Sequence, residues 1–255
     1  MEQPEAAASG GAGDKTLAVL AAAVGGARFA EVVRETGLPK ATVHRIVESL
    51  RRSGHLTQSE SAAFAPGPAS LELARRAMTG LDIAALARPV IDRLVERADA
   101  TVHLGVRLGD RIVYLVRADA PGKPYQMPSR VGEAIPLHTS AIGKAVLASL
   151  EADELERFCR RTALLPRTKA SLRDRQALTE DLDRTRQRGY ALDSEENVDG
   201  IICVGAAIHG ADGRAVHGLS VSSITAERDI EQLAELAPDV VAAATEISAL
   251  LGRGA

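Results

Sequence analysis

The sequence predicts an α+β protein, in which an N-terminal winged helix-turn-helix is joined by a linker helix to an antiparallel sheet domain with flanking helices. Three observations predict it. Residues 29–56 show two helical patterns around a glycine, residues 55–67 show two short extended segments, and the rest of the chain shows β-hairpins separated by helices. Hairpins separated by helices favour an antiparallel sheet with helices packed against it.

The composition is that of an ordinary globular protein. The 255 residues are 45% hydrophobic and 25% charged, which argues against a fibrous or disordered chain and fits one or two domains. No apolar run is long enough for a membrane span, and the small, acidic N-terminus is not a secretory signal. Cys159 and Cys203 form neither a zinc motif nor a disulfide framework, so we expect a cytoplasmic protein with no metal and no cofactor.

The predicted winged helix-turn-helix covers residues 14–67, after a lead over residues 1–13 that we interpret as disordered. Asp14 is expected to cap the first helix. The pattern FAEVVRET predicts a second helix, and Gly37 supplies the permissive backbone for a sharp turn, after which Leu38 and Pro39 open the third helix. Two short strands around a Ser/Glu turn follow, the second ending at Pro66, and we interpret them as a wing.

The third helix has one apolar side and one basic side. Its apolar residues repeat at the spacing of a single helical face and should point inward; they are Val43, Ile46, Val47 and Leu50. The solvent side then carries Ala41, His44, Arg45, Glu48 and Arg52, with Lys40, Thr42, Ser49 and Arg51 on its flanks. Residues 28–55 hold six Lys or Arg against three Glu, so this region is basic although the net charge of the chain is -3.

A basic second helix in a helix-turn-helix is typical of a helix that enters the major groove of DNA. We expect Lys40, Thr42 and Arg45 to be the main DNA contacts, with Arg45 reading a guanine, while Arg51 and Arg52 meet phosphates. Together with Lys15 of the first helix, the predicted DNA-binding residues of this helix are Lys40, Ala41, Thr42, His44, Arg45, Arg51 and Arg52. Two alternatives remain open. In the first, the charges are only the solvated face of an ordinary helical hairpin. In the second, the winged helix serves protein contacts alone.

The second part of the chain begins with a linker helix over residues 68–82, and an effector-binding domain is expected over residues 83–255. A helix over residues 83–98 contains Pro89. Hairpins are predicted to turn at Gly109 and Asp110 and again within residues 210–213. Helices are expected over residues 140–150, 153–161, 173–189 and 226–251. This order is typical of an α+β sensor.

The segment IPLHTSAIGKAVLASL suggests an anion site at a helix start. Thr139 and Ser140 would cap the helix, and the amides of Ala141, Ile142 and Gly143 would face a small carboxylate. The alternative is that the two hydroxyls only cap the helix and that the glycine lets it pack closely. The GKA triplet is not a phosphate-binding loop, because the earlier glycine and the following hydroxyl residue are absent.

The chain resembles the IclR family of transcriptional regulators over roughly Asp14 to Leu251. The helix pair ending in GLPKATVHRIVESLRRSGHL carries the resemblance in the first part, and IPLHTSAIGKAVLA, RGYALDSEE and GIICVGAAIHGADGRAVHGLSVS carry it in the second. The resemblance implies a GAF-like effector-binding domain whose pocket is lined by Met127, Ile135, Ala141, Ile142, Asp193, Ile201, Cys203, Ser220 and Ser222.

The resemblance also implies a mechanism. A small metabolite, such as an organic acid, would bind the second domain and change the placement of two paired winged helices on operator DNA. We expect a homodimer through the linker helix and the first helix, with the reading helices one turn of DNA, ~34 Å, apart. Lys15 stands where the family commonly has an arginine, and it can neutralise a phosphate without the forked contact. Pairing of dimers into tetramers, and repression or activation, stay open.

An enzyme that converts a small acid is the alternative function, with Cys203 or Asp193 as the reacting residue. We expect no enzyme, because the flanks ICVG are typical of a buried, unreactive thiol. The histidines lack metal-ligand spacing, and we interpret each of them as structural: His103, His138, His209 and His217.

Overall fold

The computed structural model describes residues 11–59, 61–79, 83–123, 125 and 127–252. It divides into two compact units, residues 1–81 and residues 82–255. Helices and antiparallel strands occur in both units, which confirms the predicted α+β class. Among the described residues, no helix has the length and apolar character needed to cross a membrane.

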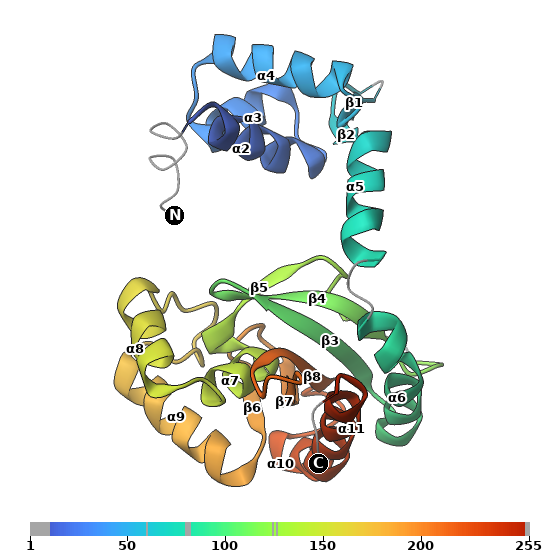
Figure 1. The fold of residues 1–255 in the computed structure, drawn as a ribbon, viewed down its shortest axis with the longest axis vertical. Coiled ribbons are helices and arrows are strands. Elements are labelled where there is room, and N and C mark those ends of the chain that lie inside the picture. Colours follow the sequence, from blue (N-terminus) through green and yellow to red (C-terminus); the bar gives the residue numbers. More distant parts are fainter. Residues whose placement is uncertain (1–10, 60, 80–82, 124, 126, 253–255) are drawn as a thin grey trace. The chain divides into compact units, whose positions relative to one another are not determined.

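The described residues of the N-terminal unit up to Gly67 form three helices and a two-stranded ribbon (Figure 1). They are α2 (Ala12–Val24), α3 (Phe29–Thr36), α4 (Lys40–Arg52), β1 (Leu56–Gln58) and β2 (Phe64–Pro66), and the two strands are antiparallel. The four predicted inward residues of α4 are all buried, in a core shared with Val19, Val32 and Phe64. The winged helix-turn-helix is therefore confirmed, although Glu60 in the wing turn lies outside the described residues.

The turn between α3 and α4 depends on a glycine, as predicted. Gly37 has φ 65°, in the left-handed region, and its N–H donates to the carbonyl of Val33 at 3.1 Å. Helix α4 begins at Lys40 and not earlier, because Leu38 is buried in the core and Pro39 is the N-cap.

The predicted N-cap at Asp14 is wrong. Helix α2 begins at Ala12, and Asp14 occupies its third position, from which its carboxylate accepts a hydrogen bond from the N–H of Gly11 at 2.8 Å. The acidic side chain thus satisfies the helix end from inside the first turn. Ala12 and Gly13 belong to the helix and not to the predicted lead, whose residues 1–10 lie outside the described residues.

The second unit follows α5 (Pro68–Thr79), which occupies the predicted linker up to residue 79; residues 80–82 lie outside the described part. Its helices are α6 (Ile83–Ala98), the 3-10 helix η1 (Leu137–Thr139), α7 (Ala141–Ala148), α8 (Ala152–Arg161), α9 (Arg175–Arg188), α10 (Ile230–Ala234) and α11 (Ala237–Leu250). Its strands are β3 (Thr101–Leu108), β4 (Arg111–Ala118), β5 (Ala134–Pro136), β6 (Ala191–Ser194), β7 (Ile201–His209) and β8 (Ala215–Ile224).

The six strands form one antiparallel sheet in the order β5-β4-β3-β8-β7-β6. Both predicted hairpins, β3–β4 and β7–β8, are confirmed. The helix predicted over residues 226–251 is instead two helices, because Pro238 lies in the first turn of a new helix, α11. The short edge strands β5 and β6 did not appear in the hairpin pattern.

Helix α7 packs on one face of the sheet, and α6 and α11 pack on the other (Figure 1). Two glycines allow α7 to lie close to the strands. A Cβ at Gly205 would come within 2.9 Å of the backbone carbon of Ala141, and a Cβ at Gly218 within 2.7 Å of the Ile142 side chain. Helices α8 and α9 contribute Phe158 and Leu182 to the core outside α7, so α7 is buried on nearly every side.

Candidate functional site

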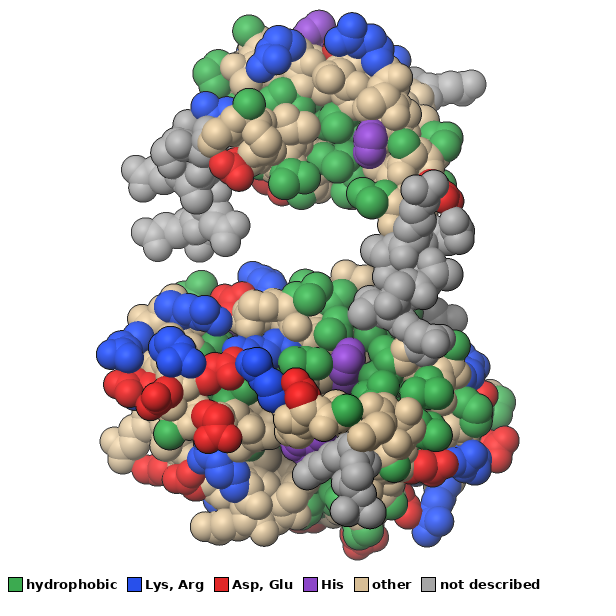
Figure 2. All heavy atoms as spheres, in the orientation of Figure 1, with side chains coloured by type: hydrophobic (Ala, Val, Ile, Leu, Met, Phe, Trp, Pro, Cys, Tyr) green, Lys and Arg blue, Asp and Glu red, His purple; other side chains and the backbone are tan. Residues whose placement is uncertain are grey.

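The outer side of α4 is the candidate DNA-binding face. Lys and Arg side chains gather there, over the side of α4 turned away from α2 and α3 (Figure 2). Six of the eight predicted DNA-contacting residues are exposed, namely Lys40, Ala41, His44, Arg45, Arg51 and Arg52, while Thr42 on α4 and Lys15 on α2 are half-buried.

The charged residues of this face differ in their freedom. Arg51 is paired with Glu48 one turn earlier, at 2.9 Å, and the His44 ring lies edge-on to Phe29 of α3. Within the described part of the chain, no hydrogen bond or ion pair holds the side chains of Arg45 and Arg52. Arg45 is therefore available for a partner, whereas Arg51 would first have to leave Glu48.

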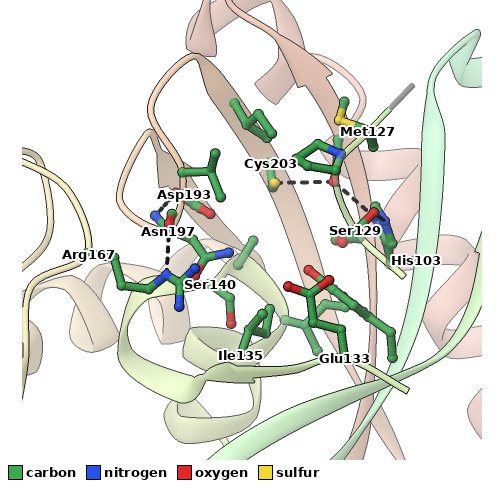
Figure 3. Close-up of a pocket in the computed structure, with 18 residues that line it drawn as sticks. His103, Met127, Ser129, Glu133, Ile135, Ser140, Arg167, Asp193, Asn197 and Cys203 are labelled. Atoms are coloured by element: carbon green, nitrogen blue, oxygen red, sulfur yellow. Dashed lines mark hydrogen bonds between the residues drawn. The ribbon is translucent and has the colours of Figure 1, made fainter. Parts of the chain in front are cut away.

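A cavity of about 190 Å³ lies in the second unit, between the sheet and the start of α7 (Figure 3). All nine residues that the family resemblance implied line this one cavity: Met127, Ile135, Ala141, Ile142, Asp193, Ile201, Cys203, Ser220 and Ser222. They come from six separate segments of the chain. The volume is below the ~300–1,000 Å³ of typical small-molecule pockets, which favours a compact ligand.

Strand alternation brings the polar wall together. Ser220 and Ser222 lie two residues apart on β8 and so share a face. Across the sheet, Ser222 pairs with Cys203 on β7, and Cys203 pairs with Asp193 on β6. The hydroxyl of Ser222 donates to Cys203 Sγ at 3.2 Å.

The start of α7 supplies backbone donors, with one correction to the expected capping. Ser140 is the N-cap, and its Oγ accepts from the N–H of Gly143 at 3.2 Å. Thr139 does not cap the helix; its hydroxyl donates to Asn197 Oδ1 at 3.1 Å. The Gly143 amide is therefore not free for an anion, and the amides of Ala141 and Ile142 are the remaining first-turn donors at the cavity.

Asp193 is a buried acid of the cavity wall whose pKa is raised. It is 2% exposed, and its Oδ1 accepts from the backbone N–H of Glu196 at 2.7 Å and of Asn197 at 3.3 Å. Burial and then the neighbouring Glu196 carboxylate raise its pKa to about 7, against the opposing effects of Lys144 and the backbone hydrogen bonds.

Lys144 is buried directly behind this wall. Its side chain is 0% exposed, and Nζ lies 2.5 Å from Glu196 Oε1 and 3.0 Å from Asp181 Oδ2. Glu196 follows β6 and Asp181 is on α9, so the lysine connects three segments through charge. Burial raises the pKa of Glu196, and Lys144 opposes that rise. The lysine therefore fixes the segment that donates two N–H groups to Asp193.

Sequence reasoning missed half of the polar lining. Six further residues of the cavity wall carry polar groups: His103, Tyr114, Ser129, Glu133, Arg167 and Asn197. They lie on β3, on β4 and in irregular segments without motifs. The alternation of apolar and polar residues along β3 and β4 was the sequence signal available for His103 and Tyr114, because every second residue of a strand lies on the same face of the sheet.

His103 corrects the interpretation of that histidine as only structural, since it lines the cavity. Its Nε2 lies 2.7 Å from Ser129 Oγ, and its Nδ1 lies 3.3 Å from Ser222 Oγ. Burial and the positive charge of Arg117 lower its pKa to about 4, so the ring is neutral at pH 7. By contrast, the side-chain hydroxyls of Tyr114 and Ser220 have no hydrogen-bond partner among the described residues, although the two residues are only 9% and 3% exposed.

The cavity does not favour the alternative in which Cys203 is a nucleophile. Burial, followed by the charge of Asp193, raises the pKa of the Cys203 thiol well above its usual range. A protonated thiol is a weak nucleophile. Across the described residues, no group of three or more His, Cys, Asp or Glu side chains is placed to hold a metal ion.

Two family models match the chain, one in each part. The IclR helix-turn-helix domain matches residues 15–60, and the bacterial transcriptional regulator IclR C-terminal domain matches residues 75–249. The regulator XynR of Escherichia coli is 31% identical over 227 residues, 88% of this chain and 89% of XynR. The Thermotoga maritima IclR structure is 27% identical, has a TM-score of 0.72 and covers 93% of this chain and 97% of its own.

A further solved structure shares the fold and contains a ligand. The IclR homologue of Microbacterium hydrocarbonoxydans, crystallised with 4-hydroxybenzoate, has a TM-score of 0.76 at 20% identity and covers 94% of this chain and 100% of its own.

Proposed function

The chain belongs to the IclR family of transcriptional regulators, and we propose that α4 reads its operator while a compact organic acid, bound in the cavity behind α7, controls that reading. Proteins of this family join a DNA-binding helix-turn-helix to an effector-binding domain. A protein that reads chromosomal DNA in this way acts in the cytoplasm.

The observation that carries the DNA-binding proposal is the segregation of α4. Its four apolar residues are buried, while Arg45 is exposed and holds no partner within the described part of the chain. A guanidinium so placed can donate two hydrogen bonds to guanine O6 and N7. Lys40 and Arg52, at the two ends of the helix, and Lys15 on α2 are assigned to phosphates, which position the protein but carry no sequence information.

The observation that carries the effector proposal is the donor set of the cavity. The hydroxyls of Tyr114 and Ser220, which have no hydrogen-bond partner in the part of the chain that the structure describes, border the same small space as the first-turn residues Ala141 and Ile142. Buried polar groups without partners are costly, so a ligand that accepts hydrogen bonds would stabilise this wall. The 4-hydroxybenzoate found with the homologue has that chemistry.

A symmetric operator requires two copies of α4, and exposed leucines offer the pairing surface. Leu17 on α2, and Leu71 and Leu73 on α5, are each 59–66% exposed. We assign the homodimer to these apolar residues.

Fluorescence anisotropy on the upstream intergenic DNA tests the DNA-binding proposal. Arg45→Ala should weaken specific binding by ~1–3 kcal/mol and relax the base preference at one position. Arg161→Ala, which removes an exposed arginine of the second unit, is the control and should bind as wild type. Equal losses on specific and random DNA, or an affinity that does not fall with added salt, would contradict the assignment.

A further inference from the structure

The cavity wall and the charged cluster behind it hold more carboxylates than cations, and this excess of negative charge limits which ligand the cavity can bind. Lys144 is 0% exposed, and its ammonium is shared between Glu196 and Asp181. Both of these carboxylates lie within 3.0 Å of it. Asp193 stands beside the same cluster without a cation of its own, and it forms part of the cavity surface.

The donors of the cavity nevertheless favour an anion. The hydroxyls of Tyr114 and Ser220 have no partner among the residues described and line the cavity together with the start of α7. The N-terminal end of α7 adds its partial positive charge. A carboxylate bound there would lie in the same small cavity as Asp193, and two ionised carboxylates cannot share such a buried site.

The remaining charged and titratable groups around Asp193 do not remove this conflict. Cys203 on β7 and Tyr114 on β4 are neutral, because burial raises the pKa of both. His103 on β3 is neutral because its pKa is lowered to about 4. Glu133 at the cavity wall adds negative charge. Among the described residues of the wall, Arg167 is the one Lys or Arg, and it is an exposed residue whose Nε donates to the Asn197 carbonyl at 3.0 Å.

We propose that the cavity takes up its carboxylate ligand together with one proton from solvent, so that Asp193 becomes a neutral acid that donates a hydrogen bond to the bound anion. The proposal rests on the proposed effector function of the same cavity. The geometry suits it, because Asp193 Oδ1 is occupied by two backbone N–H donors and accepts at 2.7 and 3.3 Å. The Cys203 side chain is a further hydrogen-bond partner of this carboxyl. The proton then belongs on Oδ2, the oxygen that the two backbone donors do not occupy.

The consequence is a specific pH dependence. Burial and Glu196 raise the pKa of free Asp193 to about 7, so below that pH the acid is already protonated and the ligand binds without proton uptake. Above it, each bound carboxylate must bring one proton, and the affinity should fall about tenfold per pH unit. A ligand without charge would show no such slope.

The test begins with a panel of aliphatic and aromatic monocarboxylates, each paired with its neutral amide. Thermal shift on the full-length protein at pH 6 identifies the binders. Calorimetric titration of the best carboxylate from pH 5.5 to 9, in two buffers of different ionisation enthalpy, then counts the protons taken up. We expect a plateau below pH 7, a tenfold loss per unit above it, and uptake approaching one proton per site at pH 8.5.

Variants separate Asp193 from other acids. Asp193→Asn keeps the acceptor oxygen and supplies a permanent donor, so it should bind the carboxylate with a flat pH profile and no proton uptake. Asp199→Asn removes an exposed carboxyl between β6 and β7 that does not line the cavity, and it should retain the wild-type slope.

Several results would overturn the proposal. Carboxylate binding by the wild type without proton uptake at pH 8.5 would refute it while leaving the effector function intact. A slope that persists in Asp193→Asn would do the same, as would tighter binding of the amides. If no carboxylate binds at any pH, both this proposal and the proposed effector chemistry fail.

Discussion

Replacing Lys144 by Met should strongly destabilise the second unit. Methionine keeps the length and apolar stem of the side chain, so the change removes charge without opening a large cavity. It leaves Glu196 and Asp181, whose side chains are 10% and 13% exposed, without the ammonium that lies 2.5 and 3.0 Å away. Removing one member of a buried ion pair typically costs ~3–5 kcal/mol. At ~2–4 °C per kcal/mol for a unit of this size, we expect a loss of roughly 10 °C in Tm.

Urea unfolding followed by circular dichroism measures the loss in the free energy of unfolding. Lys169→Met removes an exposed lysine and is the matched control, with an expected change within ~0.5 kcal/mol. The triple variant Lys144→Met, Glu196→Gln, Asp181→Asn neutralises both carboxylates that lose the lysine, of which Asp181 also pairs with the exposed Arg184 at 3.3 Å. It should recover most of the lost stability. A loss below ~1 kcal/mol in Lys144→Met would show that the cluster does not hold the unit together.

Three further changes test other parts of the structure. Gly205→Ala should cost ~1–3 kcal/mol in urea unfolding, because its Cβ would lie 2.9 Å from the backbone of α7; a neutral result would mean that α7 packs less closely. Asp193→Asn should gain stability over the wild type as pH rises from 3.8 to about 7, by on the order of 4 kcal/mol, since an acid with a raised pKa stabilises the folded state only while protonated. Parallel stability-pH curves for the two proteins would refute this. Replacing Leu71 and Leu73, both exposed on α5, by Glu should shift sedimentation from dimer to monomer, and an unchanged dimer would place the interface elsewhere.

The elements that the sequence predicted well are those whose pattern is local. Helix α4 repeats its apolar residues at helical spacing, and both hairpins have glycine turns between alternating strands. The predictions that failed concern where a helix begins, which depends on which of several neighbouring residues takes the capping or first-turn position. Asp14 serves α2 from its third position, and Pro238 begins a separate helix within a long amphipathic stretch.

The residues of the cavity show the same limit for the prediction of binding sites from sequence. The family resemblance named nine residues that the structure brings to one cavity, but His103, Tyr114 and Arg167 belong to segments that no motif marks. The contribution of His103 and Tyr114 depends on the register of β3, β4 and β8, which pairing across the sheet decides. Arg167 reaches the wall from an irregular segment between α8 and α9. The buried cluster of Lys144 was equally invisible, because Asp181 and Glu196 lie far along the chain and meet it only after folding.

Coupling between the two units is the central claim, and one measurement tests it most directly. Fluorescence anisotropy gives the Kd of the full-length protein for its upstream DNA, with and without a saturating concentration of a carboxylate that binds the cavity. A Kd that changes at least ~5-fold in either direction, a coupling of about 1 kcal/mol, is the predicted result. An identical Kd at full occupancy of the cavity would contradict the account.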